Sequence, residues 1–166
     1  FRDTTFHFDL LANRLREMAF LNKGLAIEIG QESGKSHRFF YEGGIKQFVE
    51  YLNENKSPLH EPFYVSRLVD WPERGEISVE VALQYNDTYT ETIFSFANNI
   101  NTREGGTHLI GFKSALTRTL NGFVEKLGMA KKLDENLSGD DVREGLTAVI
   151  SVKIPDPQFE GQTKGK

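Results

Sequence analysis

Residues Glu76–Asp87 have the sequence EISVEVALQYND, and this stretch decides the fold class. Apolar and mostly polar residues alternate along it: Ile77, Val79, Val81, Leu83 and Tyr85 alternate with Glu76, Ser78, Glu80, Ala82 and Gln84. A period of two is typical of a strand with one face buried and the other in water. The stretch therefore predicts a half-buried antiparallel strand.

The residues that follow predict a hairpin partner, a long helix and a closing strand. The turn NDTY leads into TETIFSFANNI, residues 90–100, which we expect to pair with residues 76–87. A helix is predicted from about Thr107 to Leu127, because apolar residues recur there at spacings of three and four: Leu109, Phe112, Leu116, Leu120, Phe123 and Leu127. LTAVISVKI, residues 146–154, predicts a last strand, which can return to the sheet only through a crossover containing this helix.

The first third of the chain predicts a helix over 8–24, strands at 25–29 and 37–42, and a second helix over 43–55. A loop with two prolines, NKSPLHEP, separates this part from the strands described above. The whole order is α-β-β-α, β-β-β, a long α and a final β. That order predicts an α+β protein with its helices on one face of the sheet.

Composition excludes several classes of protein. The 166 residues are 38% hydrophobic and 27% charged, as in folded globular proteins. The absence of cysteine excludes disulfides and thiolate chemistry, and a reducing cytoplasm is the simplest compartment. No apolar run approaches the roughly 20 residues that cross a bilayer, so no membrane partner is expected. The net charge of −4 means that any contact with nucleic acid depends on local basic side chains.

The histidines and the turn before the long helix each have a functional and a structural interpretation. No metal site is predicted, because the four histidines His7, His37, His60 and His108 are far apart in the sequence. Gly105 and Gly106 before the long helix favour a tight turn over an anion site, and Thr107 can cap that helix. His108 in the first helical turn is more typical of packing or hydrogen bonding than of catalysis.

The basic residues of the long helix and of the C-terminal segment each allow two interpretations, one structural and one functional. Lys113 and Arg118 point about 140° apart around the long helix, so they form no narrow basic stripe, although one of them could face DNA. The ending GQTKGK, residues 161–166, is either a disordered tail or a loop whose lysine contacts phosphate. The start of the chain lacks the order of a signal peptide. It also lacks an initiator Met, so we expect the chain to begin inside a longer one.

Four long stretches, in order, resemble the DNA gyrase B family of type II topoisomerase ATPase subunits. They are HFDLLANRLREMAFLNKG, YEGGIKQFVEYLN, REGGTHLIGFKSALTRTLN and GDDVREGLTAVISVKIPDPQFEGQTK. The resemblance implies that residues 1–45 end a GHKL-type ATPase domain. It implies that residues 46–166 form a transducer domain of the ribosomal-S5-domain-2-like type, with a left-handed βαβ crossover. The ATPase subunit of topoisomerase IV is the close alternative, and a non-catalytic S5-like module that binds nucleic acid or protein is the other.

The resemblance also implies roles for single residues. In this family a Gln-Thr-Lys loop reaches the nucleotide, so Gln162 and Lys164 are expected to contact the ATP γ-phosphate, with Lys164 as the catalytic cation. Lys113 is expected to face double-stranded DNA, where the family often has arginine. The Mg²⁺-binding and general-base residues belong to the upstream segment, so this fragment alone is expected to be inactive. The intact protein would form a homodimer and bind DNA gyrase A, its partner protein.

Overall fold

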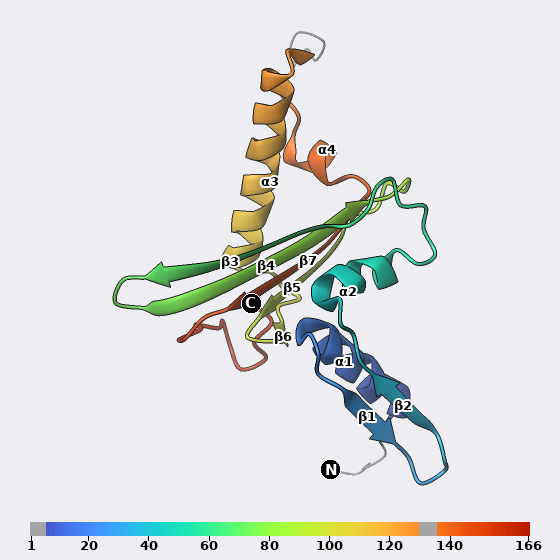
Figure 1. Cartoon of the computed structure of the whole chain (residues 1–166). Helices are drawn as coiled ribbons and strands as arrows, with labels where there is room; N and C mark the ends of the chain where they lie inside the picture. The colour runs from blue at the N-terminus through green and yellow to red at the C-terminus, as the bar shows by residue number, and fades with distance from the viewer. Residues whose placement is uncertain (1–5, 130–135) are drawn as a thin grey trace.

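The computed structural model describes residues 6–129 and 136–166. The chain begins with helix α1 (Phe8–Leu21), and β1 (Ile27–Gly30) and β2 (Ser36–Phe39) then form a two-stranded sheet separate from the main sheet. Helix α2 (Gly44–Leu52) then leads to β3 (Phe63–Trp71), β4 (Gly75–Tyr85), β5 (Thr92–Ala97) and β6 (Ile100–Asn101). The long helix α3 (Thr107–Lys126), the short helix α4 (Gly139–Arg143) and β7 (Leu146–Lys153) complete the fold (Figure 1).

The main sheet has the strand order β3-β4-β7-β5-β6, so β7 lies at its centre. Strand β7 pairs antiparallel with β4, from Ser78 opposite Lys153 to Tyr85 opposite Leu146, and parallel with β5. The predicted hairpin of residues 76–87 with 90–100 is therefore wrong, because β4 forms its hairpin with β3 and β7 separates it from β5. The sequence pattern of β4 shows that it is a strand, but it carries no information about which strand lies beside it.

Strand β7 takes the central position because nearly all of it can be buried. From Leu146 to Val152 every residue is buried, and only Lys153 is exposed. One set of its side chains, including Ala148 and Ile150, packs against α3, while Val149 packs against α2 on the opposite face. A strand that is buried on both faces reads as a nearly continuous apolar run, as TAVISV does.

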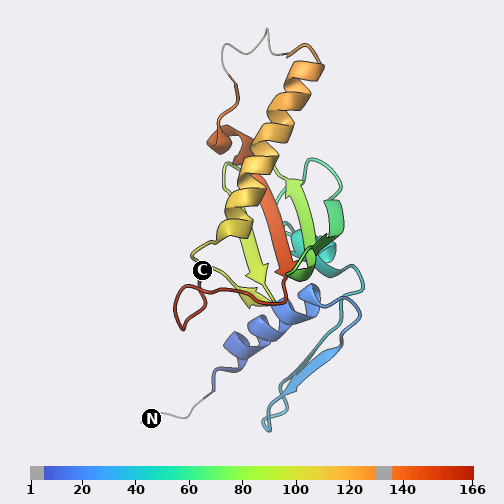
Figure 2. The same ribbon diagram turned by 90° about the vertical axis from the view of Figure 1, so that its left-hand side faces the viewer.

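Helices cover both faces of the sheet, which corrects the expectation that they lie on one face. On one side, α2 and the end of α1 pack on the sheet through Phe20, Phe48 and Val49. On the other side, Leu109, Phe112 and Leu116 of α3 pack on β7 and β4 (Figures 1 and 2). The expectation failed because Ala82 and Gln84, counted with the solvent face of β4, are 0% and 4% exposed beneath α2.

The crossover predicted between β5 and β7 is present. In Figure 2 the two parallel strands point down, α3 lies in front of the sheet, and the chain passes from β5 to β7 on its right. A right-handed connection would move to the left in this view, so the crossover is left-handed. Right-handed crossovers are the strong general rule, and this one departs from it as the resemblance implied.

Buried polar side chains join α2 to the sheet. Asn53, just after α2, donates to the Gln84 side-chain oxygen at 2.8 Å, and its own Oδ1 accepts from Thr147 at 2.7 Å and from Asn86 at 3.1 Å. All four side chains are buried. Because each of these contacts satisfies a group that is cut off from water, the network fixes the end of α2 against β4 and β7.

Candidate functional site

The C-terminal loop is held at its base by backbone hydrogen bonds. The N–H of Glu160 donates to the Lys166 carbonyl at 2.7 Å, and the N–H of Glu104 donates to the Gly165 carbonyl at 2.8 Å. Gly165 lies so close to Glu104 that an added Cβ would be 3.0 Å from the Glu104 carboxyl carbon. Phe159, which precedes the loop, packs against the apolar cluster beneath α3. The segment is therefore fastened beside the start of α3, and it is not a loose tail.

The tip of this loop is exposed to solvent. Gln162, Thr163 and Lys164 are all exposed, while the Lys164 N–H closes a turn on the Gly161 carbonyl at 3.3 Å. Gly161 and Lys164 both have positive φ, +77° and +54°. A left-handed conformation at a residue other than glycine costs roughly 1 kcal/mol, so the anchored base must hold it.

The Lys164 ammonium group has no carboxylate partner within the part of the chain that the structure describes. Its Nζ lies 5.6 Å from the centre of the Phe159 ring, a cation–π distance. Its neighbour Lys166, in contrast, pairs with Glu160 at 3.1 Å. Of these two lysines, Lys164 is the one that can offer its full charge to an external anion.

Lys113 lies about two turns into α3 and is engaged in an ion pair. Its Nζ is 2.5 Å from Glu91 Oε1, and Arg143 Nε donates to the other oxygen of Glu91 at 3.0 Å. Burial alone would raise the pKa of the Glu91 carboxyl, but the hydrogen bonds from Lys113 and Arg143 outweigh it and lower the pKa. The three groups join α3, α4 and the segment before β5.

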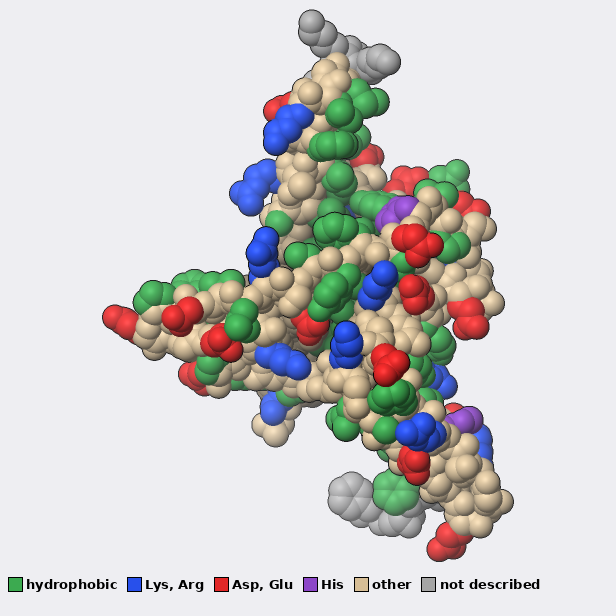
Figure 3. Space-filling model, in the orientation of Figure 1, with side chains coloured by type: hydrophobic (Ala, Val, Ile, Leu, Met, Phe, Trp, Pro, Cys, Tyr) green, Lys and Arg blue, Asp and Glu red, His purple; other side chains and the backbone are tan. Residues whose placement is uncertain are grey.

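The other basic residues of α3 form no continuous patch. The Lys and Arg side chains along this helix are separated from one another on the face that Figure 3 shows. On this face the long helix therefore presents separated cations and not a continuous basic surface.

The turn before α3 has a structural role in the described residues. Gly106, with φ of +150°, stands at the N-cap position without a side-chain cap, so the predicted Thr107 cap is wrong because Thr107 is already the first helical residue. His108 Nε2 lies 3.1 Å from Thr102 Oγ1, and burial lowers the pKa of the His108 imidazole. His108 is thus a hydrogen-bonding and packing residue, as the sequence indicated.

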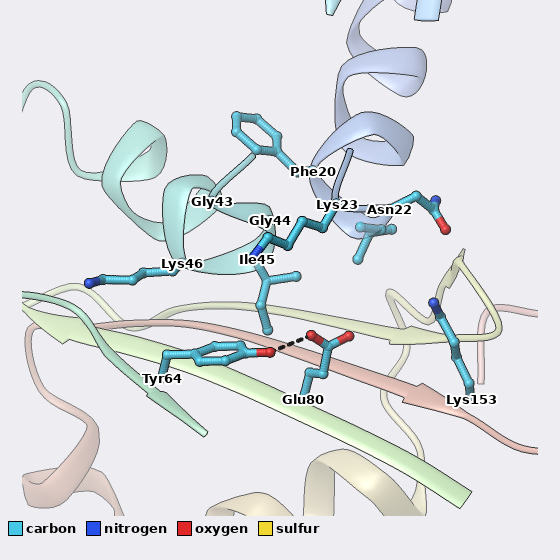
Figure 4. A pocket seen from close by; sticks show the side chains of 11 residues that line it. Phe20, Asn22, Lys23, Gly43, Gly44, Ile45, Lys46, Tyr64, Glu80 and Lys153 are labelled. Carbon is cyan, nitrogen blue, oxygen red and sulfur yellow. Dashed lines mark hydrogen bonds between the residues drawn. The ribbon is translucent and has the colours of Figure 1, made fainter. Parts of the chain in front are cut away.

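Two of the cavities lie on opposite faces of the sheet. The first, about 470 Å³, lies between the end of α1, the start of α2 and the sheet, and Lys23, Lys46 and Lys153 line it. Figure 4 shows Glu80 at its floor, where this carboxylate accepts a hydrogen bond from the Tyr64 hydroxyl at 2.6 Å. The second, about 510 Å³, is an apolar groove between α3 and the β3–β4 face. Neither cavity is lined by Gln162 or Lys164.

Among the described residues, no group of three or more His, Cys, Asp or Glu side chains is placed to hold a metal ion. In the same residues, no helix has both the length and the hydropathy needed to cross a membrane.

Comparison with known proteins decides the family. A family model described as DNA gyrase B matches residues 44–166. The DNA gyrase B protein of Clostridium acetobutylicum is 59% identical over 168 residues, which cover 100% of this chain and 26% of the relative. The chain belongs to the DNA gyrase B family. The gyrase B protein of Halalkalibacterium halodurans is 58% identical over 98% of this chain and 25% of the relative, so the chain spans about a quarter of the length of these relatives.

Solved structures of the gyrase B family share the fold. The 43K ATPase domain of Thermus thermophilus gyrase B, in complex with an aminocoumarin, aligns with a TM-score of 0.80 at 38% identity, over 98% of this chain and 45% of that one. The topoisomerase IV ATP binding domain of Francisella tularensis aligns with a TM-score of 0.74 at 28% identity, over 99% of this chain and 43% of that one. The predicted α+β class and the gyrase B resemblance are confirmed.

The sequence-predicted residues of this gyrase B family chain fall in two places. Gln162 and Lys164 share the exposed tip of the C-terminal loop, while Lys113 lies farther along α3 beside α4. Sequence reasoning missed Glu91 and Arg143, which are 52 residues apart and meet only in the folded chain. Their charges alone gave no signal, because acidic and basic residues occur throughout the sequence.

Proposed function

We propose that this chain is the transducer segment of an ATP-dependent type II DNA topoisomerase, the gyrase B component of DNA gyrase. Its role is to couple ATP binding and hydrolysis to clamp closure and DNA strand passage through the loop that carries Gln162 and Lys164. Residues 1–45 would end the ATPase domain and residues 46–166 would form the transducer domain.

The observation that carries this proposal is the contrast between the base and the tip of the C-terminal loop. The base is tied to Glu104 and Glu160 through backbone hydrogen bonds, whereas Gln162 and Lys164 are exposed. A contact made at such a tip would be linked to the body of the domain through the two backbone hydrogen bonds at the base of the loop. A loose tail would bind without moving anything.

The chemistry of the tip fits a phosphate group. Lys164 brings a point charge that no carboxylate of the described residues neutralises, and Gln162 adds a neutral hydrogen-bond donor. ATP held by the rest of the intact protein supplies the phosphoryl group. Lys164 then stabilises negative charge electrostatically and does not act as a base.

The size of the effect limits what the loop does alone. A hydrogen bond with a charged group contributes about 1.5–3 kcal/mol and a neutral one about 1 kcal/mol, so the two residues supply roughly 2–4 kcal/mol. Moving a two-state equilibrium from 1:99 to 99:1 takes about 5.5 kcal/mol. The remainder must come from other contacts of the intact protein, such as pairing of two ATPase regions.

The proposal includes the surroundings of the intact protein. It would act in the cytoplasm as a homodimer of its ATPase region, with DNA gyrase A and double-stranded DNA as partners. Mg²⁺ would be held by the upstream segment, and Lys113 would face the DNA.

A pair of lysine variants in the intact protein tests the proposal. We expect Lys164→Ala to reduce the rate of ATP hydrolysis by at least roughly a hundredfold, the scale on which loss of one transition-state charge contact acts. Lys166→Ala is the matched control. It also removes one lysine charge, two residues from Lys164, but the Lys166 side chain is already paired with Glu160.

The steady-state ATPase rate and the thermal unfolding midpoint of both variants are the measurements. The proposal predicts folded proteins in both cases and a large loss of rate in Lys164→Ala only. Equal rates in the two variants, or near-normal turnover in Lys164→Ala, would remove the loop from the mechanism.

A further inference from the structure

Glu91 bridges two cations that come from different helices. One of its oxygens lies 2.5 Å from Lys113 Nζ on α3, and the other accepts from Arg143 Nε on α4 at 3.0 Å. The Glu91 and Lys113 side chains each keep 33% of their accessible surface, whereas Arg143 keeps 14%. Solvent therefore reaches the Glu91–Lys113 contact, and an anion from outside could reach it too.

Lys113 and Arg143 are arranged as the cations of a phosphate-binding site would be, and the Glu91 carboxylate occupies the place of the phosphate. A phosphodiester presents two equivalent anionic oxygens, as a carboxylate does, and lysine and arginine are the usual partners of both groups. An incoming backbone phosphate would replace one charge-assisted contact with another of the same kind. Only a side-chain rotation of Glu91 is needed, because its backbone is set by the start of β5 at Thr92.

The two cations would respond differently if Glu91 moved away. Arg143 would stay in place, since it also donates to Asp140 at 2.7 Å and lies over Gly139, where an added Cβ would be 2.7 Å from its guanidinium. Lys113 would lose the one carboxylate with which it pairs in the described residues. The exchange thus frees one lysine beside an arginine that is already positioned.

We propose that Glu91 is a positioning residue that competes with DNA phosphate for Lys113, so that DNA binds this face of α3 by displacing an intrachain carboxylate. The inference rests on the proposed DNA-facing role of Lys113 and adds its regulation. Binding by this exchange is weak, because each phosphate must first displace Glu91. It is independent of the DNA sequence, because it involves only the phosphate backbone. A strand that has to pass along the protein requires contacts of that kind.

The test measures binding of a short duplex DNA to the 166-residue chain by fluorescence anisotropy over a series of salt concentrations. Glu91→Gln is expected to strengthen binding about twofold to fivefold at low salt, the range that one exposed ion pair covers. The slope of log K against log salt should change little, because Lys113 neutralises the same phosphate in both proteins and only the competing carboxylate is lost. Glu91→Asp keeps the carboxylate and should behave like the unaltered chain.

Two further variants separate competition from a change in net charge. Glu125→Gln changes the net charge by the same amount at an exposed carboxylate on α3, the helix of Lys113, and this carboxylate forms no ion pair in the described residues; it should strengthen binding less than Glu91→Gln does. Adding Lys113→Gln to Glu91→Gln should abolish the gain. Circular dichroism of each variant establishes that it is folded.

The outcomes distinguish this inference from the function on which it rests. A gain that equals that of Glu125→Gln, or one that survives loss of Lys113, overturns the competition. If Lys113→Gln weakens binding equally with and without Glu91, Lys113 contacts DNA but Glu91 does not compete. If Lys113→Gln changes nothing in either background, the DNA-facing role itself is wrong and the competition fails with it.

Discussion

At the scale of single residues, Gly145 shows how closely the chain fits around the start of β7. Its φ is +71°, and an added Cβ would lie 2.6 Å from the Asn86 carbonyl oxygen and 2.7 Å from that of Thr88. Both contacts are with backbone atoms, which cannot rotate aside as a side chain can. Glycine is therefore required here by conformation and by space at once.

We expect Gly145→Ala to lower the free energy of unfolding by about 2–4 kcal/mol, through left-handed strain and the steric clash together. Gly122→Ala is the matched control, because Gly122 lies within α3 with nothing within 4 Å of its Cβ position. That control should be neutral or stabilise by up to about 1 kcal/mol. Urea denaturation of both variants provides the comparison, and similar midpoints for the two would contradict this account.

Individual residues differ in how far the sequence could predict them. The roles expected of Gln162 and Lys164 rest on the resemblance, because the residues alone left GQTKGK open between a tail and a loop whose lysine contacts phosphate. The backbone bonds of Glu104 and Glu160 that fasten it depend on tertiary structure. His108 was predicted correctly from its place in the first turn of a helix, which is local information.

At the scale of elements, the Glu91–Lys113–Arg143 contact joins three segments and makes their association dependent on pH. The pKa of the Glu91 carboxyl is lowered, so the folded state binds this proton less readily than the unfolded chain does. The stabilisation is complete above the ordinary carboxyl pKa of 4.5 and is lost as the pH falls through the lower folded value. The charges that face Glu91 are Lys113 and Arg143, with Asp140 on the far side of the guanidinium.

We expect Glu91→Gln to reduce the free energy of unfolding by up to about 1 kcal/mol at pH 7.5, the usual range for a partly exposed ion pair. The difference from the unaltered chain should shrink below pH 4.5, because protonation removes the same charge that the substitution removes. Urea denaturation across this pH range measures it. A difference that does not depend on pH would mean that packing, and not charge, explains the effect.

The positions of helices and strands in the sequence were predicted better than the pairing of strands in the sheet. The boundaries of α3 and β7 follow from periods and turn residues, and both agree with the structure. The pairing of β4 was wrong because a period of two defines the faces of a strand and says nothing of its edges. The stripe of α3 was also only partly right, since Phe123 and Leu127 are 56% and 55% exposed where the helix extends beyond the sheet (Figure 1).

At the scale of the whole molecule, the exposed tip of the C-terminal loop is separate from the cavities beside it. Gln162 and Lys164 line neither of the two cavities described above, and a third, of about 250 Å³, is lined by Phe159, Glu160 and Lys166 at the base of the loop and not by its tip. The described residues hold no metal-binding cluster. The family relatives are about four times as long, so the rest of a site would come from other regions of an intact protein.

We therefore expect isothermal calorimetry of the 166-residue chain with a non-hydrolysable ATP analogue and Mg²⁺ to show no measurable heat of binding. One exposed lysine and one glutamine supply too little free energy to hold a free nucleotide in water. Salt titration of any weak signal distinguishes a general charge effect from a pocket. Tight binding that persists at high salt would mean that the nucleotide site has been placed wrongly.

The central position of β7 has a consequence for biosynthesis. Because β7 follows the other strands of its sheet in chain order and yet lies between β4 and β5, the hairpin of β3 and β4 leaves the ribosome with no partner on its inner edge. That edge must wait for about 60 residues more, at roughly 5–20 residues per second, before the strand that covers it is made. Chaperones and translation speed should therefore influence the yield of this domain more than that of a sheet built in sequential order.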